Sequence, residues 1–155
     1  MKISLSGLKL IREYEGLRMN AYADNFGTWT IGYGSVRWAD GRLVMEGDKL
    51  QNQEEAERLL DYSLQSAIRV VNTHVKVPIT QNQFDALVSL VYNIRGRNFN
   101  DSGMVELLNG GEYDRAGLVL LQLDDPEICR MTAGCRGIEG LRKRRKREFE
   151  IFRLI

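Results

Sequence analysis

Two carboxylates and a hydroxyl near the N-terminus have the residue types of an acid and a base that act with a bound water. Eight residues separate Glu15 from Asp24, and five separate Asp24 from Thr30. Between the two acids the sequence changes from a helical pattern to a short-strand pattern, which allows them to face each other across a cleft. Glu15, Asp24 and Thr30 are therefore candidate catalytic residues.

Glu15 lies at the end of a predicted first helix, whose start Ser4 or Ser6 can cap. Glu15 continues the apolar stripe of this helix, whereas Glu13 lies four residues after Lys9, in register for an ion pair on the solvent side. An apolar environment disfavours the charged form of a carboxylic acid. Glu15 is therefore predicted to be a general acid.

Asp24 lies instead in a polar turn sequence with Asn25, Gly27 and Thr28. A carboxylate in such a turn stays ionised and accepts protons, which is the behaviour of a general base. Two acids at this separation also occur by chance in many soluble proteins, so the pair needs support from the rest of the chain.

The elements around these residues predict an α+β fold. Short apolar and aromatic segments up to residue 44, with Asp40-Gly41 as a turn signal, predict a small antiparallel sheet. Apolar residues at helical spacing then predict a long helix from Asn52 to about His74. Further helices are expected from Thr80, from Asp101 or Ser102 to Gly110, over 113–123 and over 138–152.

These elements predict one domain with two lobes, over residues 1–155. The arrangement expected is a β-rich lobe at about 17–58, a connecting helix at about 53–74, and a mainly helical lobe at about 75–155 that includes the N-terminal helix, which is also the lobe arrangement implied by the family resemblance described below. A chain of 155 residues with 43% hydrophobic residues can bury a substantial core.

Composition excludes several other classes of function. The net charge of +1 does not favour a nucleic-acid partner, and no apolar run is long enough for a bilayer span, so we expect no stable membrane insertion. No signal peptide is recognised, which predicts synthesis in the cytoplasm, and we expect a monomer. Cys129 and Cys135 are expected to be free thiols, with a local disulfide as the alternative. Because His74 is the single histidine and is distant from both cysteines in the sequence, no zinc site is expected.

The one strong charge run is basic and covers residues 142–147 of the predicted last helix. Arg145 shares a stripe with apolar residues and is expected to face inward, where a guanidinium needs a carboxylate partner. Arg142 is expected to be able to reach the cleft instead. The remainder of the run is interpreted first as surface charge, and then as attraction to an anionic wall or membrane surface; nucleic-acid binding is the least favoured reading.

Motifs along nearly the whole chain resemble the phage-type lysozyme family, the muramidases of tailed-phage endolysins. The Glu15, Asp24, Thr30 spacing and the Thr-Ile-Gly-x-Gly strand from Thr30 match that family. So do the central segments 83–87 and 92–94, and the C-terminal pattern Gly-Leu-x-x-Arg-Arg-x-x-Glu that begins at Gly140. Ser35 stands where most relatives have a histidine, so a structural contact of that histidine is absent here.

The resemblance implies hydrolysis of the β-1,4 bond between N-acetylmuramic acid and N-acetylglucosamine in peptidoglycan. Glu15 would protonate the leaving oxygen, and Asp24 with Thr30 would activate a water on the opposite sugar face, which gives inversion. It also implies that Val36, Tyr92 and Ser102 line the sugar cleft, that no metal or cofactor is required, and that a holin-type pore releases the protein to the wall.

In the family an arginine of the last helix approaches the catalytic glutamate, and the sequence leaves open whether Arg142, Arg144 or Arg145 has this role. Two other functions remain as alternatives. A lytic transglycosylase would use a single acid and produce an anhydro-sugar end, and a catalytically silent protein would bind the cell wall without cutting it.

Overall fold

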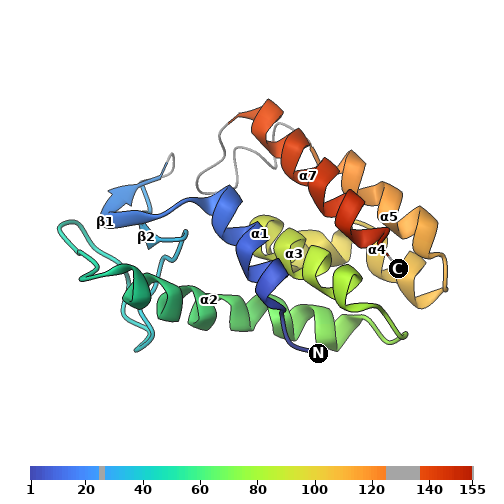
Figure 1. Cartoon of the computed structure of the whole chain (residues 1–155), viewed down its shortest axis with the longest axis horizontal. Helices are drawn as coiled ribbons and strands as arrows, with labels where there is room; N and C mark the ends of the chain where they lie inside the picture. Colours follow the sequence, from blue (N-terminus) through green and yellow to red (C-terminus); the bar gives the residue numbers. More distant parts are fainter. Residues whose placement is uncertain (25–26, 125–136, 155) are drawn as a thin grey trace.

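The computed structural model describes residues 1–24, 27–124 and 137–154 of the chain. Most of these residues are helical, and a small antiparallel sheet follows the first helix. Figure 1 shows this sheet near the start of the long helix α2, while the last helices group at the other side of the molecule. The elements, in order, are α1 (Leu5–Glu15), β1 (Arg18–Ala23), β2 (Trp29–Gly32), α2 (Gln53–His74), α3 (Gln81–Asp101), α4 (Met104–Asn109), α5 (Tyr113–Gln122) and α7 (Ile138–Phe152).

Local capping sets both ends of α1. The Ser4 hydroxyl accepts a hydrogen bond from the Gly7 amide at the start of the helix, as one of the two predicted caps. The helix ends because Gly16 has a positive φ of 69°, and its amide donates to the Arg12 carbonyl at 3.0 Å. Glu15 is therefore the last residue of a well-defined helix, which fixes where its side chain begins.

The sheet is smaller than the sequence predicts. Strands β1 and β2 pair with Tyr22 opposite Thr30. The turn at Asp40-Gly41 is present, but its flanks form only an isolated bridge between Arg37 and Leu43. The prediction of strands on both sides of this turn is wrong.

One side chain makes several of the hydrogen bonds in this loop. The carboxylate of Asp48 accepts hydrogen bonds from the Trp38 indole, the Arg42 guanidinium and the Met45 amide, all at 2.9 to 3.0 Å. These bonds lower the pKa of Asp48, the Trp38 bond most strongly. The loop is therefore held by this carboxylate together with backbone hydrogen bonds across the turn, such as the bond of 2.9 Å from the Trp38 amide to the Arg42 carbonyl.

Helices α2 and α3 form the centre of the molecule, and their predicted starts are confirmed. Asn52 accepts from the Glu55 amide at 2.9 Å, and Thr80 forms a capping box with Gln83. Helix α3 packs against α1, α2, α4 and α7, which explains why most of its first half is buried. Four apolar residues that recur at helical spacing in this helix are all buried: Phe84, Leu87, Val88 and Val91.

The C-terminal helices agree with the sequence except at one start. Helix α7 has the predicted bounds, and α5 ends one residue earlier than predicted. Helix α4 does not start at Asp101 or Ser102, because α3 continues to Asp101 and the left-handed Gly103, with φ of 75°, separates the two helices. No helix in the described ranges has both the length and the apolar character needed to cross a membrane.

Candidate active site

The side chain of Glu15 leaves the end of α1 and enters the protein instead of pointing to solvent. It is 8% exposed, and its Oε1 accepts a hydrogen bond of 2.7 Å from Nη1 of Arg144, on α7. Glu13 lies on the outer face and pairs with Lys9, as predicted. Helical periodicity alone therefore separates the inward acid from the outward one.

Arg144 is held from several sides at once. Its Nε donates to Glu148 at 3.0 Å, and its Nη2 donates to the Ser89 carbonyl at 3.1 Å. The guanidinium also lies over the ring of Tyr14, 5.4 Å from the ring centre. Burial by itself lowers the pKa of Arg144, but the carboxylates of Glu15 and Glu148 outweigh burial and raise it above its ordinary value. Arg144 is therefore a fixed cation beside Glu15.

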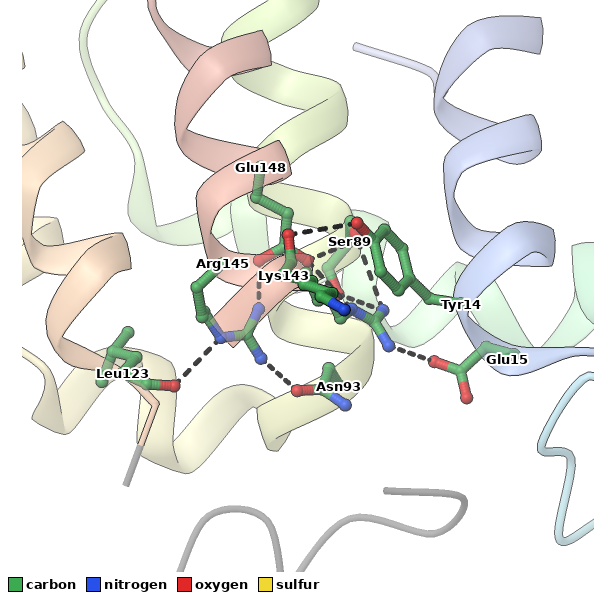
Figure 2. Close-up of polar contacts among 9 residues, drawn as sticks. Tyr14, Glu15, Ser89, Asn93, Leu123, Lys143, Arg145 and Glu148 are labelled. Atoms are coloured by element: carbon green, nitrogen blue, oxygen red, sulfur yellow. Dashed lines mark hydrogen bonds and ion pairs between the residues drawn. The ribbon is translucent and has the colours of Figure 1, made fainter. Parts of the chain in front are cut away.

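Arg145 completes the charge balance of this buried cluster. It donates to Glu148, to the side-chain oxygen of Asn93 and, at 3.0 Å, to the Leu123 carbonyl, as Figure 2 shows. Burial lowers the pKa of Arg145, although Glu148 opposes this effect. Two guanidiniums thus face two carboxylates, Glu15 and Glu148, and a buried cluster without net charge avoids an uncompensated ion in the core.

The structure assigns the three arginines that the sequence left open. Arg145 faces inward as predicted and is 1% exposed. Arg144 is the arginine that contacts Glu15. The expectation that Arg142 reaches the cleft is wrong. Its guanidinium donates to Asp124 at 2.8 Å on the surface, and its side chain is 62% exposed.

Glu148 is the residue of this cluster that reasoning from the residues assigned no role. It is fully buried and accepts from both arginines and, at 2.6 Å, from the Ser89 hydroxyl. A signal was available, because Glu148 follows Arg144 by four residues and Arg145 by three, the two spacings that bring helical side chains together.

Asp24 is positioned by a turn. Its backbone amide donates to the Thr28 carbonyl at 2.9 Å, and its Oδ1 accepts from the Thr28 amide at 2.8 Å. Thr30 is fully buried in β2, and its hydroxyl donates to the same Thr28 carbonyl at 3.2 Å. Thr28 therefore connects the two predicted catalytic residues through its backbone alone, a link that sequence spacing does not reveal.

Tyr22 is a further residue that interacts with the charges of both acids. No pattern in the sequence indicated it. It pairs with Thr30 in the sheet and lies near the end of β1, two residues before Asp24. Burial raises the pKa of Tyr22, and the carboxylates of Glu15 and Asp24 raise it further. The Tyr22 hydroxyl therefore lies within electrostatic range of both acids.

Tyr92 and Gly34 line the cavity that Glu15 enters, together with Asn93 and Arg95. The Tyr92 hydroxyl donates to the Tyr33 carbonyl at 2.8 Å, and burial raises its pKa above the ordinary value of a tyrosine. Gly34 has φ of 90°, and a Cβ there would lie 3.4 Å from Oε2 of Glu15. A glycine at this position keeps the second carboxylate oxygen of Glu15 accessible from the cavity.

The other two predicted sugar contacts have different surroundings. Val36 lines an adjoining cavity of about 360 Å³, which also contains Tyr92. Ser102 lies at the junction of α3 and α4, where its hydroxyl donates to the Phe99 carbonyl at 2.6 Å and accepts from the Met104 amide. That hydroxyl contributes to the helix junction, and the role of Ser102 as a sugar contact stays a prediction.

Ser35 replaces the histidine expected from the resemblance, and it forms a different contact. Its hydroxyl lies 2.8 Å from the hydroxyl of Ser63 on α2. The neighbouring Ile31 and Ser35 exchange two backbone hydrogen bonds of 2.9 Å, which hold the turn that contains Gly34. Cys129 and Cys135 lie outside the described residues, as does the segment between them.

Comparison with known proteins gives matches over almost the whole chain. The phage lysozyme family matches residues 12–148. An endolysin of Acyrthosiphon pisum secondary endosymbiont phage 1 is 38% identical over 152 residues, which are 98% of each protein.

Solved structures agree with these sequence matches. An endolysin from Escherichia coli O157:H7 phage FAHEc1 has a TM-score of 0.85 and 35% identity, over 99% of this chain and 94% of that one. A variant of the lysozyme of phage P22 has a TM-score of 0.81 and 33% identity, over 98% of both chains.

Proposed function

Because the chain belongs to the phage lysozyme family, we propose that it is an endolysin, a lysozyme that hydrolyses bacterial peptidoglycan during host-cell lysis. The observation that supports this most directly is Glu15, a nearly buried acid held by Arg144 with its second oxygen toward the cavity beside Gly34. The bond proposed is the β-1,4 link between N-acetylmuramic acid and N-acetylglucosamine.

In the proposed reaction the protonated form of Glu15 donates its proton to the leaving glycosidic oxygen and becomes the carboxylate that balances the arginines. The Arg144 guanidinium then stabilises the carboxylate that remains, because it already lies 2.7 Å from Oε1. A fixed cation in a nearly buried site needs no rearrangement at the moment of proton transfer. Arg144 is thus a positioning residue for the acid, and does not itself act on the sugar.

Asp24 and Thr30 are proposed to orient and deprotonate the attacking water on the opposite face of the sugar. The Thr28 amide fixes the direction of the Asp24 carboxylate, and the Thr30 hydroxyl donates its hydrogen bond to the Thr28 carbonyl. Thr30 then offers oxygen lone pairs to a water hydrogen. Attack from the side away from the leaving group inverts the anomeric carbon.

The remaining parts of the proposal concern the whole protein. Residues 1–155 would act as one catalytic domain, as a monomer, with side-chain acid and base chemistry and without a cofactor. Val36 and Tyr92 are proposed to contact the sugars. Tyr92 lines the cavity that Glu15 enters, and Val36 lines the adjoining cavity, which Tyr92 also lines. A separate holin-type membrane pore would give the protein access to the wall.

The direct test replaces Glu15 by Gln, which keeps the shape of the side chain and removes its proton-donating role. We expect hydrolysis of purified peptidoglycan to fall by about 10²–10⁴-fold, while circular dichroism shows an unchanged helix content. Glu13→Gln is the matched control, since Glu13 lies on the exposed face of the same helix. Its activity should equal that of the wild type.

Reducing ends measure the rate in this test, and mass spectrometry identifies the products. Reducing N-acetylmuramic acid ends are expected from a hydrolase. Anhydro ends would instead identify a transglycosylase. Full activity of the Glu15→Gln protein would remove Glu15 from the mechanism.

A further inference from the structure

A large apolar groove lies where the start of α5 meets the end of α7 and the segment before α3. Its volume is about 900 Å³, and it shares no lining residue with the cavity that Glu15 enters or with the adjoining cavity. Most of the side chains that line it are apolar, among them Ile79, Tyr113, Leu118, Phe149, Phe152 and Leu154. We call this cavity the terminal groove. An apolar pocket of this size with a few polar groups is typical of a ligand-binding site.

The walls of the terminal groove are held by packing and by a hydrogen bond. Helices α5 and α7 lie side by side and run in opposite directions (Figure 1). Gly117 allows their close contact, because a Cβ at this residue would lie 3.2 Å from the ring of Phe152. The Tyr113 hydroxyl donates to the Pro78 carbonyl at 2.9 Å, which fixes the segment before α3 against α5. The groove is therefore preformed, and a ligand can enter it with little rearrangement of the protein.

Large apolar side chains are exposed in the terminal groove and beside it. Leu118 is 49% exposed and Leu154 is 57% exposed, and both line the groove. Leu121, on the same helix as Leu118, is 39% exposed. Folding leaves this apolar surface in contact with water, and a hydrocarbon chain in the groove removes part of it from water.

Two side chains of opposite charge also line the terminal groove. Asp114 lies in the first turn of α5, and Arg153 follows the last residue of α7. Within residues 1–24, 27–124 and 137–154, neither of them takes part in an ion pair. The Arg153 guanidinium lies over the ring of Phe149, 5.3 Å from the ring centre, which keeps this cation at the groove. A ligand with a single charge leaves one of the two side chains without a partner, whereas a ligand with both charges can pair with both.

We propose that the terminal groove binds a single-chain phospholipid whose headgroup carries a phosphate and a primary ammonium. The acyl chain covers the apolar lining, the phosphate pairs with Arg153, and the ammonium pairs with Asp114. A guanidinium binds phosphate oxygens with parallel hydrogen bonds, and a primary ammonium offers three N–H donors to a carboxylate. A quaternary ammonium has no such donor. The terminal groove is separate from the proposed catalytic site, so the inference does not depend on the proposed function.

The test measures the dissociation constants of three phospholipids with the same single acyl chain, by isothermal titration calorimetry below the concentrations at which they form micelles. Lysophosphatidylethanolamine has the phosphate and a primary ammonium, lysophosphatidylglycerol lacks the ammonium, and the ammonium of lysophosphatidylcholine is quaternary. The variants are Arg153→Gln and Asp114→Asn. The matched controls are Arg97→Gln and Asp61→Asn, because both residues are exposed on helices outside the groove.

We expect the wild type to bind lysophosphatidylethanolamine about tenfold more tightly than either of the other two lipids, as one charge-assisted hydrogen bond provides. Asp114→Asn should remove the preference over lysophosphatidylglycerol. Arg153→Gln should weaken the binding of all three lipids by about tenfold, because each carries the phosphate. Both controls should bind like the wild type. All four variants should hydrolyse peptidoglycan at the wild-type rate when no lipid is present.

Equal affinities of the wild type for the three lipids would overturn the inference, because binding would then depend on the acyl chain alone. Unchanged affinities in both Arg153→Gln and Asp114→Asn would also overturn it, since the lipid would then bind elsewhere. Sedimentation velocity at several protein concentrations tests a different occupant. A dimer that either substitution dissociates would assign the terminal groove to a second copy of the chain, against the lipid.

Discussion

The two acids of the site are held in opposite ways. Glu15 is bound by Arg144, a residue 129 positions away in the chain, inside a buried cluster that joins α1, α3 and α7. Asp24 is bound by the amide of Thr28, four positions away, in an exposed turn. One acid depends on the assembly of the helical part of the molecule, and the other depends on a local turn.

The difference follows from burial. A charge removed from water needs partners for every polar atom, and such partners come from several elements at once. A charge in a turn keeps water, and hydrogen bonds within the turn can fix its direction. We therefore expect changes in the buried cluster around Glu15 to reduce the stability of the protein. Changes at Asp24 should reduce activity and leave stability nearly unchanged.

The largest effect should come from Glu148→Gln, which removes one carboxylate from the buried cluster while keeping the shape of the side chain. Arg144 and Arg145 would then face one carboxylate instead of two, so the free energy of unfolding should fall by about 3–5 kcal/mol. Urea denaturation followed by circular dichroism measures this loss. Glu139→Gln is the control, because its pair with Lys143 is exposed and should contribute less than about 1 kcal/mol.

The second effect is catalytic and comes from Arg144→Lys. A single ammonium group cannot donate to Glu15, Glu148 and the Ser89 carbonyl together, so the acid loses its fixed position. We expect kcat to fall about 100-fold with little change in KM, because small displacements of a catalytic group are costly. Arg142→Lys should have wild-type kinetics. A kcat within threefold of the wild type for Arg144→Lys would contradict the positioning role.

The third prediction tests a contact between α3 and the segment that follows β2. This contact is the hydrogen bond from the Tyr92 hydroxyl to the Tyr33 carbonyl. Burial raises the pKa of Tyr92, so the folded protein keeps this proton when the unfolded chain releases it. The stability tied to this proton is complete below the unfolded pKa of about 10, and it is lost as the pH rises above that value toward the folded pKa.

Tyr92→Phe should therefore be less stable by about 1 kcal/mol at neutral pH, through loss of the hydrogen bond. The gap to the wild type should narrow above pH of about 10, measured by thermal unfolding across alkaline buffers. The variant should still lose some stability at alkaline pH, because burial also raises the pKa values of Tyr14 and Tyr22. A constant gap at all pH values would contradict this account.

The smallest change in stability should come from Asp24→Asn. The amide oxygen of Asn can still accept from the Thr28 amide, so the turn keeps its hydrogen bond. We expect the free energy of unfolding to fall by no more than about 0.5 kcal/mol, whereas hydrolysis should fall by about 10²–10⁴-fold. A large loss of stability would show that Asp24 depends on more than its turn, and would remove the contrast with Glu15.

Local signals predict much of this fold. The caps at Ser4, Asn52 and Thr80 act within four residues, so their effect is visible in sequence and the helix starts agree. The failures occur where a side chain or backbone angle decides the outcome, as for the loop around Asp48 and the break at Gly103. Neither a hydrogen bond to an indole nor a left-handed angle is specified by apolar periodicity.

The amino-acid sequence by itself determined the inward direction of Glu15, the turn that carries Asp24 and the family of the protein. It did so because helical periodicity, turn chemistry and motif spacing act over a few residues. Only the tertiary structure decided that Arg144 is the partner of Glu15 and that Glu148 joins Arg144 to Arg145. It also decided that Arg95 lines both the cavity at Glu15 and the adjoining one. Neighbouring arginines differ by about 100° around a helix, and which of them meets an acid 129 residues away depends on how α1, α3 and α7 pack.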